Sequence, residues 1–170
     1  MKNILVTGLP RVGKTTLLVN IISEMDKKVV GFVTKEVKEN NMRIGFEIES
    51  FSGHKLMLAS KKNRNSIHRI ANYGVFVENI DTIVGHLLLE LQKNEYDLIV
   101  IDEIGKMELF SKKFISFVEE SLNKKKVLGS IMLKNNDFSR KIKERSDTIV
   151  FEITINNRDK IRKRIMELLM

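Results

Sequence analysis

Hydrophobic residues follow two kinds of pattern along the chain. Short runs are apolar almost throughout, which is typical of strands buried on both faces of a parallel sheet. These runs are residues 4–6, 29–33, 98–101, 127–132 and 149–153. Between most of them, apolar residues recur at the three- and four-residue spacing of amphipathic helices. The clearest helical stripe consists of Ile80, Ile83, Val84, Leu87, Leu88 and Leu91. Strands that alternate with helices predict an α/β domain with a mostly parallel sheet.

Residues 35–58 depart from this rhythm. Apolar and polar residues alternate there, as in residues 44–49, and turn-prone pairs occur at Asn40-Asn41 and Ser52-Gly53. The pattern predicts an antiparallel hairpin or meander inserted after the second strand. The polar and basic residues 60–69 that follow are expected to form a mobile loop.

The composition narrows the class of protein. The chain has 170 residues, of which 42% are hydrophobic and 31% charged, so we expect a single folded domain over residues 1–170. No cysteine and only three histidines are present, which disfavours disulfides, thiol catalysis and a zinc centre. Neither a targeting segment nor an apolar run of membrane-spanning length is visible, and we expect a soluble, cytoplasmic protein. The net charge of +8 fits either a nucleic-acid partner or a well-solvated surface.

A phosphate-binding loop stands near the N-terminus. Its residues fit the pattern G-x-x-x-x-G-K-[ST] between a buried strand and a helix predicted over residues 16–25. They are Gly8, Leu9, Pro10, Arg11, Val12, Gly13, Lys14 and Thr15, followed by Thr16. Backbone N–H groups and the helix N-terminus favour bound phosphate. We expect Lys14 to reach the β- and γ-phosphates and the Thr15 hydroxyl to ligate Mg²⁺.

Two acidic residues follow the apolar run at residues 98–101. We expect Asp102 to hold Mg²⁺ through its hydration shell and Glu103 to deprotonate a water that attacks the γ-phosphorus. Alternatively, the two acids could simply be the polar end of a strand, with no role in catalysis. The phosphate-binding loop in the same chain favours the functional interpretation. Adjacent acids favour hydrolysis over transfer, although some kinases also carry two acids here.

Residues 101–109, IDEIGKMEL, closely resemble the signature of a small P-loop nucleoside-triphosphatase family, the THEP-type family that includes the cancer-related nucleoside triphosphatase. The resemblance extends over nearly the whole chain. Its further segments are Gly31-Phe32-Val33-Thr34 with Glu36-Val37, Arg43-Ile44-Gly45-Phe46, Tyr73-Gly74-Val75, Leu128-Gly129-Ser130-Ile131, and Thr154 with Asn157-Arg158.

The resemblance implies a three-layer, RecA-like P-loop fold. It also implies Mg²⁺-dependent hydrolysis of ATP, GTP, CTP, UTP or TTP to diphosphate and phosphate, with weak base selectivity and slower cleavage of diphosphates. By position, Asp102 would hold the metal, Glu103 would be the catalytic carboxylate with Lys14, and Ile104 and Gly105 would lie among the nucleotide-binding residues.

Several charged residues keep two or three interpretations. Arg11 stands where the family usually has Gly, and its side chain either adds positive charge beside the phosphates or is simply solvated. Arg158 is a candidate for transition-state stabilisation, for contact with the base, or for a solvated helix start. Lys106 and Glu108 either support the acidic pair or belong to a polar loop before a helix that starts near Ser111.

Two other functions stay open. A small-molecule or nucleoside kinase would use the same loop, with residues 60–69 as a lid, but no acceptor signature is recognisable. A nucleic-acid-associated ATPase is suggested only by the charge of +8, because the chain lacks a basic motif interleaved with aromatic residues.

Overall fold

In the computed structural model, which describes residues 2–93, 95–124 and 126–170, each of the five apolar runs forms a strand. The strands are β1 (Asn3–Thr7), β2 (Val29–Glu39), β3 (Met42–Ser50), β4 (Lys55–Ser60), β5 (Arg69–Ile70), β6 (Tyr73–Val75), β7 (Leu98–Ile104), β8 (Val127–Ile131) and β9 (Thr148–Glu152). The helices are α1 (Lys14–Ser23), α2 (Val77–Lys93), η1 (Glu108–Phe110), α3 (Lys112–Asn123), α4 (Asp137–Lys143) and α5 (Arg158–Leu169).

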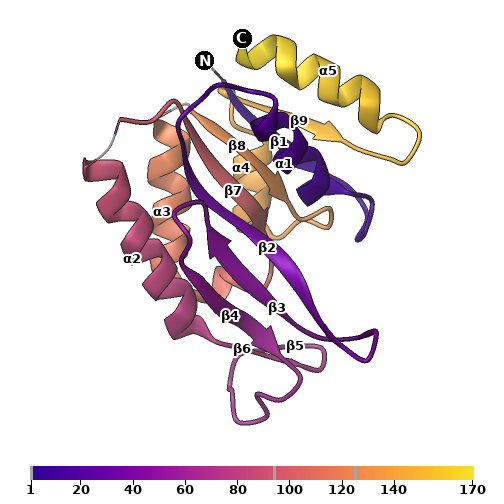
Figure 1. Ribbon diagram of the computed structural model, residues 1–170, viewed down its shortest axis with the longest axis vertical. Helices are drawn as coiled ribbons and strands as arrows, with labels where there is room; N and C mark the ends of the chain where they lie inside the picture. The colour runs from indigo at the N-terminus through magenta and orange to yellow at the C-terminus, as the bar shows by residue number, and fades with distance from the viewer. Residues whose placement is uncertain (1, 94, 125) are drawn as a thin grey trace.

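All the strands join one mixed sheet, in the order β5-β6-β4-β3-β2-β7-β8-β1-β9 (Figure 1). The neighbours from β2 through β7, β8 and β1 to β9 pair in parallel, and the pairs from β2 outward to β5 are antiparallel. The predicted α/β architecture, with a parallel centre and an antiparallel hairpin, is therefore confirmed. Strand β8 lies between β1 and β7, which separates the phosphate-binding strand from the acidic one.

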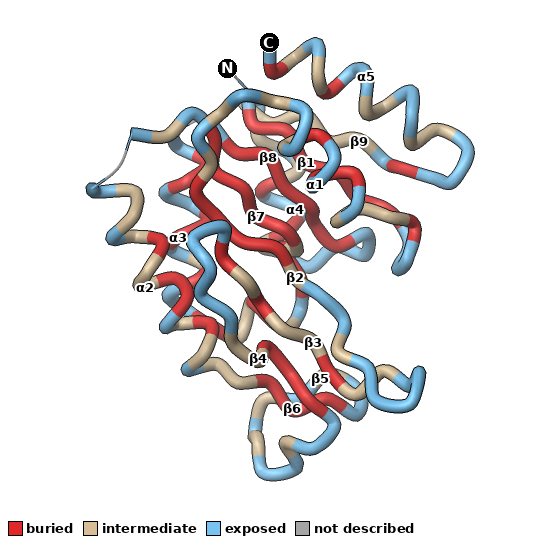
Figure 2. The backbone as a smooth tube through the Cα atoms, in the orientation of Figure 1, coloured by how far each residue is buried: buried red, intermediate tan, exposed pale blue. Residues whose placement is uncertain are grey.

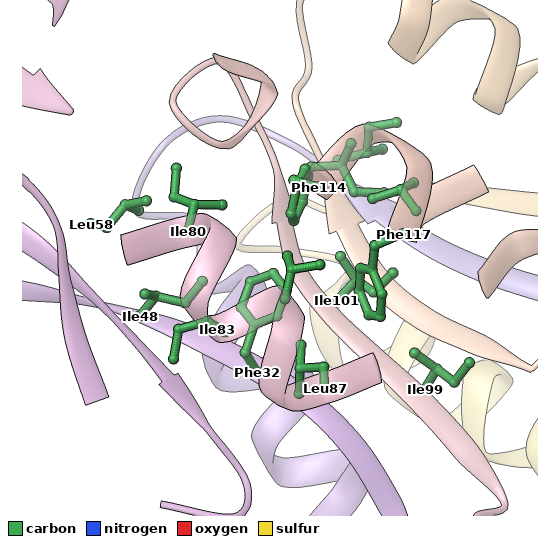
Figure 3. Packing of buried hydrophobic residues seen from close by; sticks show 14 of the residues in the cluster. Phe32, Ile48, Leu58, Ile80, Ile83, Leu87, Ile99, Ile101, Phe114 and Phe117 are labelled. Carbon is green, nitrogen blue, oxygen red and sulfur yellow. The ribbon is translucent and has the colours of Figure 1, made fainter. Parts of the chain in front are cut away.

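Helices cover both faces of the sheet, because side chains of successive strand residues point to opposite faces. On β1, Leu5 joins the hydrophobic cluster formed with α2, α3 and α4, whereas Ile4 and Val6 join the cluster formed with α1 and α5. In the larger cluster, Phe32 on β2 packs edge-to-face against Phe114 on α3, with ring centroids 6.0 Å apart (Figure 3). The central strands are buried along most of their length (Figure 2).

The antiparallel part begins within β2. Residues 29–32 of β2 pair with β7, and residues 32–39 of the same strand pair with β3. The hairpin's first strand is thus a continuation of β2 and not a separate strand. Its tip, at Asn40 and Asn41, lies beyond the parallel strands at an exposed end of the molecule (Figures 1 and 2).

The polar segment that precedes β5 is built from turns. The Arg69 guanidinium donates hydrogen bonds to the carbonyls of Asn63 and Arg64, and the Ser66 hydroxyl donates to the carbonyls of His68 and Val75. These bonds tie the segment to the sheet edge, while its mobility stays a prediction. Within the described ranges, no helix has both the length and the apolar character needed to cross a membrane.

Candidate active site

The phosphate-binding loop connects the buried strand β1 to α1, and its two glycines are required by close neighbours. Gly8 has φ 155°, and a Cβ there would stand 2.6 Å from the carbonyl oxygen of Ile153. Gly13 has φ 97°, and a Cβ there would stand 2.5 Å from Nη1 of Arg158. Backbone atoms therefore exclude a side chain at Gly8, whereas at Gly13 the positive φ is the main reason for glycine, because the Arg158 side chain could move away.

Between these glycines, the loop exposes its variable side chains. Leu9, Pro10 and Arg11 are exposed, and Val12 is buried. Arg11 has φ 64°, a left-handed conformation that favours glycine. Its guanidinium Nε lies 3.7 Å from a carboxylate oxygen of Glu36 on β2. Arg11 is thus paired with the antiparallel extension of the sheet, while its effect on phosphate binding stays a prediction.

Lys14 and Thr15 begin α1 and turn their side chains towards the sheet edge. The Lys14 ammonium Nζ donates hydrogen bonds to the carbonyls of Gly8 and Leu9, at 3.0 and 3.1 Å. The Thr15 hydroxyl donates to Oδ2 of Asp102 at 2.7 Å. Thr16 is exposed at the start of the helix.

Asp102 is fully buried near the end of β7, where four donors surround it. Besides Thr15, the Thr34 backbone N–H lies 3.2 Å and its hydroxyl 3.4 Å from Oδ2, and the Ser130 hydroxyl donates to Oδ1 at 2.9 Å. Burial raises the pKa of Asp102, and the hydrogen bonds from Thr15, Thr34 and Ser130 oppose this rise.

The Thr15 hydroxyl and the Asp102 carboxylate are hard oxygen ligands of the kind that Mg²⁺ prefers. Mg²⁺ usually keeps several waters and binds through one or two protein groups plus substrate phosphates. In the part of the chain that the structure describes, no cluster of three or more His, Cys, Asp or Glu residues could hold a metal ion by itself. The residues present therefore fit a magnesium ion that arrives with a nucleotide.

Glu103 follows Asp102 in a left-handed conformation, with φ 80°. Its backbone N–H donates to the Ser130 hydroxyl at 2.9 Å, so the same serine holds both acidic residues. Burial raises the pKa of the Glu103 carboxyl, the positive charge of Lys14 lowers it, and the negative charge of Asp102 raises it. Because neighbouring strands lie about 4.8 Å apart, the interposed β8 separates the ends of β1 and β7 by about 10 Å.

Gly105 completes the acidic segment. A Cβ at this position would stand 2.8 Å from both Oε1 of Glu103 and Oε2 of Glu108. Glu108 is only 2% exposed, whereas Lys106 is exposed. Of the two residues whose role the sequence leaves open, Glu108 thus lies inside the site and Lys106 outside it. Ile104 is buried, and its carbonyl accepts a hydrogen bond from the backbone N–H of Met132 at 3.2 Å.

The C-terminal segment after β9 reaches the phosphate-binding loop from the other side. Nη1 of Arg158 donates to the Val12 carbonyl at 3.3 Å. The Asn157 side chain is engaged within its own loop, since it accepts from the Thr154 backbone N–H and donates to the Glu152 carbonyl. The three interpretations of Arg158 are not distinguished by this contact, which nevertheless brings its guanidinium beside Gly13.

Ser130 and Thr34 are absent from the site residues predicted from the sequence, although both lie in the segments that carry the family resemblance. Each places polar groups on Asp102 from a neighbouring strand. A serine in the buried apolar run at residues 127–132 was the available signal, because a polar group in such a strand needs a partner.

Comparison with known proteins gives consistent matches over the whole chain. A family model described as NTPase matches residues 3–166. Nucleoside-triphosphatase THEP1 from Thermotoga sp. (strain RQ2) is 40% identical over 167 residues, which cover 98% of this chain and 94% of the relative. The protein of the same name from Methanocaldococcus jannaschii is 34% identical over 166 residues, 96% of this chain and 94% of the relative.

Two solved structures share the fold. The crystal structure of THEP1 from the hyperthermophile Aquifex aeolicus has a TM-score of 0.84 and 35% identity, and the match covers 99% of each chain. The solution structure of a human cancer-related nucleoside triphosphatase has a TM-score of 0.79 and 30% identity, and the match covers 100% of this chain and 98% of that one.

Proposed function

The chain belongs to the NTPase family of nucleoside-triphosphatases, and from this membership we propose that it is a Mg²⁺-dependent nucleoside-triphosphate phosphohydrolase. The family resemblance predicted from residues 101–109 is confirmed by the matches. The proposed substrates are ATP, GTP, CTP, UTP and TTP, cleaved to the diphosphate and phosphate with weak base selectivity, and diphosphates are cleaved more slowly.

One observation carries the proposal: the hydroxyl of Thr15 lies 2.7 Å from the carboxylate of Asp102, and Glu103 follows next in the chain. The phosphate-binding loop and the acidic strand end, separated in sequence, therefore meet at one edge of the sheet. A nucleotide bound by the loop has its terminal phosphate directed to that edge.

In the proposed mechanism, backbone N–H groups of the loop and the Lys14 ammonium bind the phosphates. The Lys14 hydrogen bonds to the Gly8 and Leu9 carbonyls are exchanged for phosphate oxygens when a nucleotide enters. The Thr15 hydroxyl would ligate Mg²⁺ and Asp102 would hold it through its hydration shell, and the ion would supply positive charge beside the phosphates.

Glu103 acts as the general base in this proposal. A carboxylate with a raised pKa is a better proton acceptor than an ordinary one, and burial raises the pKa of Glu103 in this way. Lys14 opposes the rise and keeps the ionised form accessible. Glu103 accepts a proton from the water as the water attacks the γ-phosphorus, and the diphosphate leaves on the opposite side.

The experiment measures phosphate release from each of the five triphosphates, with Mg²⁺ and with a chelator. We expect release only with Mg²⁺, at rates that differ little among bases. The variant Glu103→Gln should lower kcat by about 10²- to 10⁴-fold, because it removes the proton acceptor and keeps the size of the side chain. Its affinity for a fluorescent nucleotide should change little.

The matched control is Glu120→Gln, on the exposed side of α3, which should leave kcat unchanged. A Glu103→Gln variant that hydrolyses at the wild-type rate would contradict the role of Glu103. Absence of phosphate release from wild-type protein, together with consumption of the triphosphate once an alcohol acceptor is supplied, would favour the kinase alternative.

A further inference from the structure

Glu108 is a buried carboxyl that the proposed mechanism does not use. It begins the short helix η1 and is only 2% exposed. In the part of the chain that the structure describes, no ion pair joins it to a lysine, arginine or histidine. A carboxyl this deeply buried usually has a cationic partner, and backbone hydrogen bonds alone do not explain why an acidic residue stands here.

The Glu108 carboxyl lies close to the Glu103 carboxyl, beside Gly105. Oε1 of Glu103 and Oε2 of Glu108 each lie 2.8 Å from a single point, the place where a Cβ of residue 105 would stand. The two oxygens are therefore separated by no more than twice that distance, with no side chain between them. The two carboxyl groups therefore face the same space beside Gly105.

Two carboxylates this close in a buried site do not both ionise. For Glu108, burial and the negative charge of Glu103 raise the pKa well above the ordinary value, and backbone hydrogen bonds from Glu108 and Gly105 only partly oppose this. One of the two carboxyls should therefore hold a proton, and Glu108 is the better candidate, because it is 2% exposed and no described cation pairs with it.

The backbone around Glu108 holds the side chain in place. The Leu109 N–H donates to the Gly105 carbonyl at 3.2 Å, and the Ser111 N–H donates to the Glu108 carbonyl at 3.0 Å. The Ser111 hydroxyl then accepts from the Phe114 N–H at 2.9 Å and begins α3. Glu108 thus stands on a segment anchored to the hydrophobic core, which suits a group that orients another.

We propose that Glu108 is a positioning residue for hydrolysis: as an uncharged acid it donates a hydrogen bond to the Glu103 carboxylate across Gly105 and directs that carboxylate at the attacking water. This inference rests on the proposed function, and it adds to it a residue outside the nucleotide-binding and metal-binding groups. It also gives a reason for Gly105, since a Cβ there would stand 2.8 Å from an oxygen of each carboxyl and both side chains would have to shift.

The test uses two substitutions at residue 108 that differ in one property. Glu108→Met has a similar length and no hydrogen-bond donor, so kcat should fall by about tenfold to hundredfold while KM stays within about twofold. Glu108→Gln is uncharged and keeps a donor, so its kcat should lie at least about fivefold above that of Glu108→Met. Thermal unfolding of both variants shows whether they are folded, and Glu120→Met on exposed α3 controls for loss of a surface carboxylate.

Equal loss of kcat in both variants would overturn the inference, because it would mean that a charged Glu108 is required. Wild-type kcat in both would also overturn it, because Glu108 would then serve packing alone. These results are separate from a failure of the proposed function. That failure would appear as wild-type protein that binds nucleotide and releases no phosphate, and it is measured first.

Discussion

The phosphate-binding loop at residues 8–15 and the acidic segment at residues 102–108 lie at the same edge of the sheet. The loop is expected to bind phosphate through its backbone N–H groups, whereas the acidic segment acts through buried side chains. The loop leaves Leu9 and Arg11 exposed. The acidic segment buries Asp102 and Glu108, and the Asp102 carboxylate accepts hydrogen bonds from Thr15, Thr34 and Ser130 on other elements. A site made from backbone tolerates varied side chains, whereas a site made from buried side chains depends on each neighbour. Substitutions in the two regions should therefore differ greatly in effect.

Apart from Glu103→Gln, the largest effect should come from Gly105→Ala in the acidic segment. Its methyl group would stand 2.8 Å from the carboxyl oxygens of both Glu103 and Glu108, so these groups must move. We expect kcat to fall by at least about 100-fold, because displacing a reacting group by 1 Å has this cost. The measurement is steady-state phosphate release.

Gly85→Ala is the matched control, because a Cβ at this position in α2 has no neighbour within 4 Å. It should retain activity and stabilise the protein by about 0.5–1 kcal/mol, since alanine favours the helix. If Gly105→Ala were as active as Gly85→Ala, the close packing of the acidic segment would have no functional importance.

A smaller effect is expected for Ser130→Ala. The change removes the donor to Asp102 and the acceptor of the Glu103 N–H. We expect kcat to fall by about tenfold and the free energy of unfolding to fall by about 1–3 kcal/mol, because buried polar groups lose their partner. Steady-state kinetics and urea unfolding measure the two quantities. Ser121→Ala, at a buried serine on α3, is the control and should leave kcat unchanged. Equal kcat in the two variants would exclude a role for Ser130.

The third prediction concerns pH and stability. The pKa of Glu108 in the folded protein is raised well above 4.5, so the folded state keeps a proton that the unfolded state loses above about pH 4.5. The free energy of unfolding should consequently fall as pH rises through the interval between these two pKa values. The Glu108→Gln variant has no carboxyl at this position, so its free energy of unfolding should lack the part of the decrease with pH that Glu108 causes. Thermal unfolding of both proteins at pH 5 and pH 8 should give a larger stability advantage of the variant at pH 8. An advantage that is equal at both pH values would contradict this.

The smallest effect should follow from Arg11→Gly in the phosphate-binding loop. Arg11 occupies a left-handed conformation that costs an ordinary residue about 1–2 kcal/mol, and glycine relieves it. The ion pair to Glu36 that is lost involves an Arg11 side chain that is 70% exposed, and such pairs contribute about 0–1 kcal/mol. Thermal stability should therefore stay equal or rise slightly. KM and kcat should each change by less than about threefold if the side chain is only solvated. A larger fall in kcat would instead support charge stabilisation by Arg11.

The chain itself predicted most of the architecture, because apolar periodicity is a local property. The five buried strands, the helices between them and the hairpin after the second strand all follow from the spacing of hydrophobic residues. What the pattern did not predict is that β2 continues unbroken from its parallel part into the hairpin. Its polar residues beyond Thr34 pair with β3 through the backbone, and hydrogen bonding of this kind does not depend on side-chain type.

The sequence by itself determined the phosphate-binding loop and the position of Asp102 and Glu103, since both are contiguous motifs at strand ends. Only the tertiary structure decided that Ser130 links the two acids, that Arg158 reaches the Val12 carbonyl from 146 residues away, and that Glu108 is buried while Lys106 is exposed. The physical reason is that a site formed by the backbone of one loop uses residues that are adjacent in the sequence. Burial and side-chain contacts depend instead on which distant strands and helices the fold brings together.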